Sequence, residues 1–251
     1  MSRRCDGWRP WGSFGTGYLN TVHLNGVQYS DIVPADSAPR RHTRDGVALA
    51  ALAILDEWGL ADLTMRRLAT SLDVQPSALY WHFPNKQSLL ADLADLIVAR
   101  VRPVAVTDAA WPEPVRAEAA ALRDALLAYR DGAELVASTL ALGLGGEASV
   151  TRLADAIAGG GFDAATSRRA AVALLHFVLG QVGYEQQRLQ FDSLGVVPAG
   201  SALDDTPPHE AFAFGVDLFV TGLGAPHLGT HNARPAPTGR GTDAAGRRPR
   251  A

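Results

Sequence analysis

The chain is poor in the residues from which covalent and metal sites are built. Cys5 is the only cysteine among 251 residues, so an internal disulfide is impossible and a cysteine-built zinc site is excluded. Histidine, aspartate and glutamate show no HExxH or other spacing typical of metal ligands, and we expect no metal and no cofactor. A lone cysteine suits a reducing compartment, which favours the cytoplasm.

Long apolar runs are also missing. No stretch approaches 18 uninterrupted apolar residues, so we expect no membrane span, and the first arginines are not followed by the apolar segment of a secretion signal. Lys86 is the only lysine, which indicates a genomic base-composition bias rather than a mechanism. The net charge of 23 − 26 = −3 is a poor guide to nucleic-acid binding when one segment does the binding.

A helical pattern runs through the middle of the chain, and the composition, 47% hydrophobic and 20% charged, is that of a globular protein. Val47, Ala50, Ile54 and Trp58 recur with the period of a helix that Gly59 ends. Further helices are predicted at residues 112–129, 132–141, 147–159, 164–190 and 208–224. Alternating β patterns with hairpin turns are absent, so we expect an all-α fold.

Both ends lack this periodicity. Residues 1–40 hold scattered glycines, prolines and aromatics, and we expect a poorly ordered N-terminal arm. Residues 225–251 are rich in proline, glycine, alanine and arginine, which predicts a disordered basic tail. Two interpretations stay open, an inert extension and an auxiliary contact to DNA phosphates.

The segment from Thr64 to Lys86 carries the most informative pattern. Thr64 is a good N-cap for a short helix that buries Leu68, and Pro76 suits the first position of a second helix ending at His82. Two short helices joined by about three residues predict a helix-turn-helix. The second helix is expected to be roughly 10–12 Å long, which suits a major groove about 12 Å wide.

Outward residues of this segment offer groups that bind DNA. Arg66 is expected to read a guanine edge, and Ala78 to meet a thymine methyl group. Tyr80 and His82 are expected to hydrogen-bond phosphates, as is Lys86 at the start of the next helix. The expected DNA-binding residues are Thr64, Arg66, Gln75, Pro76, Ser77, Ala78, Tyr80, Trp81, His82 and Lys86. The alternatives are core packing of the Tyr-Trp-His run and a general-base role for His82, which lacks a suitably spaced nucleophile or carboxylate.

Residues 43–102 resemble the DNA-binding domain of the TetR family of bacterial repressors. The resemblance is carried by LTMRRLA (63–69) and LYWHFPNK (79–86). Trp111 and the runs ALLAYRDGA (125–133), HFVLG (176–180) and FAFGVDLFVTGL (212–223) are similar to the regulatory domain of the tetracycline-repressor branch. The resemblance implies a homodimer that binds a palindromic operator and releases it when a small-molecule effector enters the C-terminal domain.

This resemblance implies a regulator, not an enzyme, with a helix-turn-helix domain at 41–102 and a ligand-binding and dimerisation domain at 103–224. We expect it to control an exporter or an antibiotic-related gene. The alternatives are a regulator that answers no small molecule and an activator. An all-α enzyme or a binding module without DNA would belong to another class, and a gel shift with the promoter next to the gene separates it.

Two apolar stripes predict how the chain dimerises. Paired across a two-fold axis, the helices that carry them would form a four-helix seam. The stripes comprise Leu174, Val178, Gln181, Val182 and Glu185 on one helix and Phe212, Val216 and Phe219 on another. The alternative is that one stripe faces its own core.

The positions that the resemblance assigns to the effector depart from the tetracycline-repressor pattern. Val136 replaces a histidine that ligates magnesium, although Thr139 is kept, and valine has no lone pair for a metal. We therefore predict that the effector is not a magnesium–tetracycline chelate.

The family's drug-contacting positions match Arg102, Glu118 and Leu122. Burying the Glu118 carboxylate needs a partner, for which Arg102 is the candidate. We predict a larger, partly apolar, metal-free molecule with a polar or ring-bearing edge near His176 and Tyr184. An empty, non-responsive cavity is the alternative.

Overall fold

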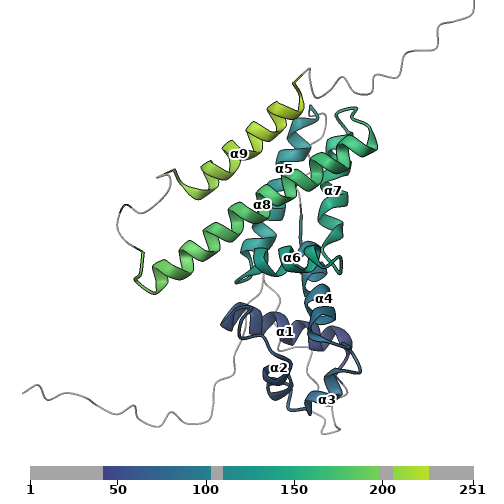
Figure 1. Ribbon diagram of the computed structural model, residues 1–251, viewed down its shortest axis with the longest axis vertical. Coiled ribbons are helices and arrows are strands. Elements are labelled where there is room, and N and C mark those ends of the chain that lie inside the picture. Colours follow the sequence, from purple (N-terminus) through teal and green to yellow (C-terminus); the bar gives the residue numbers. More distant parts are fainter. Residues whose placement is uncertain (1–41, 103–109, 198–199, 201–205, 226–251) are drawn as a thin grey trace, which may run out of the picture. The chain divides into compact units, whose positions relative to one another are not determined.

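The structure is a computed structural model that describes residues 42–102, 110–197, 200 and 206–225. These residues form nine α-helices and no β-strand, which confirms the all-α prediction (Figure 1). The helices are α1 (Arg44–Trp58), α2 (Met65–Ser71), α3 (Pro76–Leu79), α4 (Lys86–Val98), α5 (Pro112–Leu127), α6 (Gly132–Ala141), α7 (Glu147–Ala158), α8 (Ala164–Ser193) and α9 (Pro208–Leu223). The predicted arm (1–40) lies outside the described residues, as does the predicted tail apart from Ala225.

Side-chain caps fix where the first helices begin. Thr64 Oγ1 accepts the Arg67 N–H at 3.1 Å, so Thr64 is the predicted N-cap of α2. Asn85 and Ser88 form a capping box at the start of α4, in which Asn85 Oδ1 accepts the Ser88 N–H at 2.8 Å. Gly59 ends α1 as predicted, with a φ of 86° that a side chain would strain. Local chemistry therefore determines these boundaries.

Helix α1 buries a wider face than its predicted stripe. Val47 and Ile54 are buried as expected, but Trp58 is exposed, and the Arg67 guanidinium lies 4.8 Å from the centre of its ring. The cause is that α1 contacts both α2 and α4, so a second row of side chains is covered. That second row consists of Ala48, Ala51, Leu52 and Leu55.

Helix α8 organises the regulatory helices, because it contacts α5, α6, α7 and α9 (Figure 1). It begins where Asp163 Oδ1 accepts the N–H groups of Ala165 and Thr166, both at 2.9 Å. It runs to Ser193, three residues past its predicted end. Stacking of Phe177 on Phe212, with ring centres 5.8 Å apart, joins α8 to α9. None of the helices in the described ranges is long and apolar enough to cross a membrane.

Candidate nucleic-acid interface and ligand pocket

Helix α2 presents an unpaired arginine. Arg66 is exposed, and within the described ranges its guanidinium has no ion-pair partner. The adjacent Arg67 is engaged, because its Nη2 donates to Asp62 Oδ1 at 2.8 Å and its guanidinium lies over the Trp58 ring. Arg66 is therefore available to an external acceptor, while Arg67 stabilises the fold.

Helix α3 packs beside α2 but is shorter than predicted (Figure 1). It ends at Leu79 rather than His82, and the Leu79 carbonyl accepts the N–H groups of His82 at 3.0 Å and Phe83 at 2.9 Å. Pro84 explains the early end, because the residue before a proline disfavours the helical conformation. The predicted two-turn recognition helix is thus one helical turn followed by a hydrogen-bonded turn.

The surface around α3 is built on a buried anchor. Leu79 and Phe83 are buried, and they hold the intervening residues against the core. Trp81 between them is 90% exposed, and Tyr80 is also exposed. A large ring with so little cover needs an external partner, since single exposed tryptophans of this degree serve no packing purpose.

The ten predicted DNA-binding residues divide into two groups. The larger group is exposed: Thr64, Arg66, Gln75, Pro76, Ser77, Ala78, Tyr80 and Trp81. His82 and Lys86 are half-buried, with Lys86 at the first residue of α4. The Thr64 hydroxyl already accepts the Arg67 N–H, so only its proton is available to another molecule.

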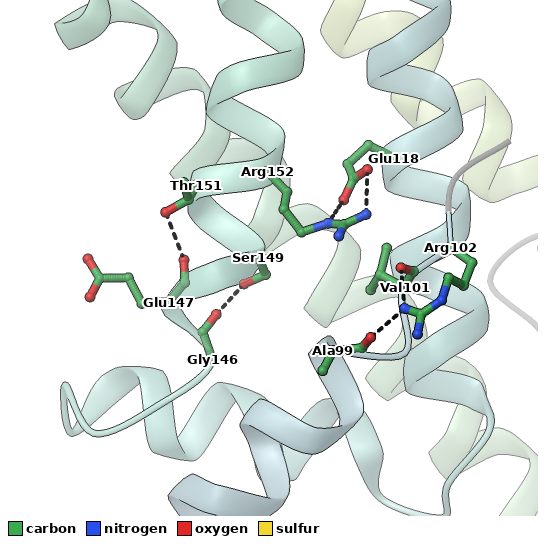
Figure 2. Close-up of polar contacts among 9 residues, drawn as sticks. All are labelled: Ala99, Val101, Arg102, Glu118, Gly146, Glu147, Ser149, Thr151 and Arg152. Atoms are coloured by element: carbon green, nitrogen blue, oxygen red, sulfur yellow. Dashed lines mark hydrogen bonds and ion pairs between the residues drawn. The ribbon is translucent and has the colours of Figure 1, made fainter. Parts of the chain in front are cut away.

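Glu118 on α5 is buried and ion-paired, but not with the predicted partner (Figure 2). Arg152 of α7 binds it, with Nη2 donating to Oε2 at 3.1 Å and Nε donating to Oε1, and this hydrogen bonding raises the pKa of Arg152. Arg102 instead donates through Nη1 to the Ala99 carbonyl at 2.5 Å and to the Val101 carbonyl at 3.1 Å. The predicted Glu118–Arg102 pair is therefore wrong, because Arg152 already satisfies the carboxylate.

The other three predicted effector positions also lie in the core. Leu122 and Val136 are buried in the main hydrophobic cluster. Thr139 is buried too, and its hydroxyl donates to the Val136 carbonyl at 3.0 Å, inside its own helix. These side chains complete the packing beneath α6 and line no cavity.

A pocket of about 690 Å³ lies instead between α6 and α8. Of the seven predicted effector residues, His176 and Tyr184 line it and the other five do not. On α6 the pocket takes the face that carries Ala137 and Leu140, which is opposite the face of Val136. Sequence reasoning chose the wrong face of α6, because the resemblance placed ligand contacts where this chain has a filled core.

Gln186 is a polar residue of the pocket wall that serves the fold. Its Oε1 accepts the Ala133 N–H at 3.2 Å, and its Nε2 donates to the carbonyls of Tyr129 at 2.8 Å and Leu126 at 3.1 Å. All of its strong hydrogen-bonding positions are therefore used. The described ranges contain no cluster of three or more histidine, cysteine or acidic side chains suited to a metal ion.

Hydrogen bonds tie both ends of α6 to the helices of the DNA-binding segment. Asp131, just before α6, has a left-handed φ of 55°; its Oδ2 accepts the Leu60 N–H at 2.8 Å and its Oδ1 accepts from Gln190 of α8. After α6, the Gly146 N–H donates to Asp95 of α4 at 2.8 Å. Asp131 also lines the pocket. A displacement of α6 is thus transmitted to α1 and α4.

Most of the predicted dimer stripe lies in the core of a single chain. The residues buried there are Leu174, Val178, Val182, Phe212 and Val216. Glu185 is held by Arg123 of α5, whose Nη2 donates to both carboxylate oxygens at 2.8 and 2.9 Å. Gln181 and Phe219 remain partly exposed. The stripe faces inward because α8 and α9 both pack on α5.

The apolar side chains that face outward on α9 were missed. Phe214 is 65% exposed and Leu218 is 59% exposed, one helical turn apart. Their signal was present in the FAFGVDLFVTGL run, where apolar residues occupy two faces of the helix. Periodicity alone does not say which of two apolar faces is covered by its own chain.

Comparisons with known proteins match this architecture. The family model described as bacterial regulatory proteins, tetR family, matches residues 49–93, and that described as tetracyclin repressor-like, C-terminal domain, matches residues 103–199. The Escherichia coli tetracycline repressor protein class C is 35% identical over 210 residues, covering 75% of this chain and 94% of that protein.

Solved structures agree in fold and sequence. The crystal structure of Mycobacterium smegmatis BioQ aligns with a TM-score of 0.65 and 43% identity, covering 72% of this chain and 97% of that one. A TetR variant from Acinetobacter baumannii AYE in complex with minocycline aligns with a TM-score of 0.57 and 32% identity, covering 72% and 96%. BioQ has also been solved with its double-stranded DNA operator, at a TM-score of 0.61 and 42% identity, covering 73% and 98%. With both family models matched and one relative covered almost in full, this chain belongs to the TetR family of bacterial regulatory proteins.

Proposed function

We propose that the protein is a ligand-responsive transcriptional repressor that binds a palindromic operator as a homodimer and releases it when a small molecule binds. The observation that carries this proposal is the exposed surface of α2 and α3, with Arg66 unpaired and Trp81 almost uncovered. The operator complex of BioQ supports the DNA-binding part, and the minocycline complex of the Acinetobacter repressor supports the ligand-binding part.

We assign DNA contacts to the exposed residues of α2, α3 and the following turn, with Arg66 on a base edge and Tyr80 on phosphate. Residues 41–102 form the DNA-binding domain and residues 103–224 the regulatory domain in this proposal. Such a regulator works in the cytoplasm, where bacterial operators lie, and relatives of this kind are transcription regulators rather than enzymes.

We assign the dimer seam to the outward face of α9, centred on Phe214 and Leu218, and to the adjoining outward face of α8. Two exposed apolar side chains one turn apart form a stripe that a second copy related by a two-fold axis would cover with its own. Four helices, two from each chain, would then make the seam.

Helix α6 links the pocket to the DNA-binding domain in this proposal. It carries one wall of the pocket, and the hydrogen bonds of Asp131 and Gly146 hold its two flanks to Leu60 and Asp95. A molecule that binds better when α6 is displaced would shift the protein toward a state with altered spacing of the two recognition helices. Half-sites in successive major grooves are about 34–36 Å apart, so a change in spacing weakens operator binding.

Arg66→Ala is expected to weaken operator binding by about 1–3 kcal/mol and to relax the preference at one base position, because it removes a contact to a base edge. The test is a gel shift with the DNA next to the gene and with single-base variants of the bound site. Arg67→Ala is the matched control, since Arg67 is held by Asp62, and it should leave base preference unchanged. An unchanged base preference in Arg66→Ala would contradict the assignment.

Tetracycline with magnesium is expected to leave the melting temperature unchanged, because Val136 and Thr139 are buried and offer the metal no open site. An effector present at 100 times its dissociation constant adds about 2.7 kcal/mol of stability. For a protein of this size the melting temperature would rise by roughly 5–10 °C. A rise of that size with tetracycline and magnesium, abolished by a chelator, would show this prediction to be wrong.

A further inference from the structure

We propose that the effector is an organic cation with a largely apolar body, held between α6 and α8 on the face of α6 opposite Val136 and Thr139. This inference rests on the proposed ligand-responsive function and adds the location and charge of the site. It is carried by three features of the pocket: its apolar walls, its unbalanced charge and its exposed polar edge.

The pocket has the size and walls of a small-molecule site. Its volume of about 690 Å³ falls within the range of about 300–1,000 Å³ that such sites occupy. Ala137 and Leu140 of α6 face Leu175 of α8 across it. On the α8 wall, a Cβ added to Gly180 would meet nothing within 4 Å, and one added to Gly183 would meet only the Ala133 Cβ at 3.9 Å. The two glycines therefore leave room for a bound molecule.

The charge of the lining is of one sign. Asp131 and Glu134 both line the pocket, and no lysine or arginine does. Both Asp131 oxygens accept hydrogen bonds, from Leu60 and Gln190. Glu134 is exposed and accepts no hydrogen bond within the part of the chain that the structure describes. An anion would be repelled by this unpaired carboxylate, whereas a cation would neutralise it.

The polar edge of the pocket suits the same class of molecule. Tyr184 lines the pocket with its ring exposed, and the face of a tyrosine ring attracts a cation. His176 and Gln187 lie on the same stripe of α8 and are exposed as well. These groups can accept hydrogen bonds from an ammonium group without adding positive charge.

Glu134 would also favour the fold without any ligand, because it lies in the first turn of α6, where a helix attracts negative charge. Glu147 provides the matched control. It lies in the first turn of α7, it is exposed and paired with Arg168, and it does not line the pocket. A change that acts through the helix terminus alone would affect both sites alike.

The test uses two probes of the same shape and opposite charge, tetraphenylphosphonium and tetraphenylborate, titrated into the full chain by calorimetry. We expect one phosphonium per protomer and borate binding weaker by about tenfold or more, because one unpaired carboxylate faces the probe. Glu134→Gln should weaken phosphonium binding about tenfold and narrow the difference between the probes, and Glu147→Gln should change neither. Gly180→Leu should block both probes by filling the pocket.

Operator binding without probe, and the mass of the dimer, are measured for every variant. A wild-type chain that binds no operator DNA overturns the proposed function. Normal operator binding overturns this inference alone if the two probes bind equally, or if Glu134→Gln acts no differently from Glu147→Gln. Saturating phosphonium is expected to release operator DNA, and binding without release would overturn the effector role of the pocket.

Discussion

Replacing Phe214 and Leu218 together with aspartate is expected to convert the dimer into a monomer and to weaken operator binding by about 10²–10⁴-fold. Both side chains are exposed in the single chain, so the substitutions leave its core untouched. In the dimer they would bury uncompensated carboxylates, which is strongly unfavourable. A monomer loses the gain that comes from binding two linked half-sites, which typically amounts to about 10²–10⁴ in affinity.

Sedimentation analysis and a gel shift on the same preparation test this prediction. Leu142→Asp is the matched control, because Leu142 is also 59% exposed but lies just after α6, away from α9. It should leave the mass of the dimer unchanged. A Phe214→Asp, Leu218→Asp chain that sediments as a dimer and binds operator DNA like the wild type would contradict the assigned seam.

Gly132→Ala is expected to lower the free energy of unfolding by about 2–3 kcal/mol or more, as is typical when a close-packed site is overfilled. A Cβ at Gly132 would lie far closer than 3.0 Å to the Leu126 carbonyl oxygen, which belongs to backbone and cannot rotate away. The melting temperature should fall by roughly 2–4 °C for each kcal/mol. Urea denaturation at a fixed protein concentration measures the effect, since the stability of a dimer depends on concentration.

Gly180→Ala is the control for the same chemical change in an open position. Nothing lies within 4 Å of the added Cβ, and alanine favours a helix over glycine by about 0.8–1.0 kcal/mol, so stability should rise. Equal effects of Gly132→Ala and Gly180→Ala would mean that the close approach at the start of α6 is not a constraint.

Local signals in the sequence predicted the helices well. Thr64 and Asn85 begin helices with the caps that their side chains allow, and Gly59 ends α1 at a positive φ. These boundaries depend on atoms a few residues apart, so the sequence contains what decides them. The length of α3 was wrong, because the predicted end at His82 gave too little weight to the restriction that Pro84 places on Phe83.

Tertiary packing decided what the sequence left open. Val178 and Phe214 are both apolar and both lie on helices with apolar residues on more than one face, yet Val178 is buried in its own chain and Phe214 is exposed. Only the neighbours of each helix separate the two cases. In the same way, Glu118 found Arg152 rather than Arg102, since the partner of a buried charge is set by a helix far along the chain.

The resemblance to tetracycline repressors identified the family but placed the effector on the wrong side of α6. Val136 fills the core with an apolar side chain, so the space that a ligand would need there is already occupied. His176 and Tyr184 were chosen from the residues of α8 themselves, and they do line the pocket. A shared fold transfers to a new chain more securely than a shared ligand.

Selection of duplexes from a random DNA pool by the full-length protein tests the central claim most directly, because it needs no known operator. The account predicts enrichment of a two-fold symmetric sequence whose half-sites are about one helical turn, 34–36 Å, apart or somewhat more. It also predicts that Arg66→Ala enriches a site that is relaxed at one symmetric pair of positions. Enrichment of no sequence, or of an asymmetric site that the wild type and Arg66→Ala select alike, would contradict the account.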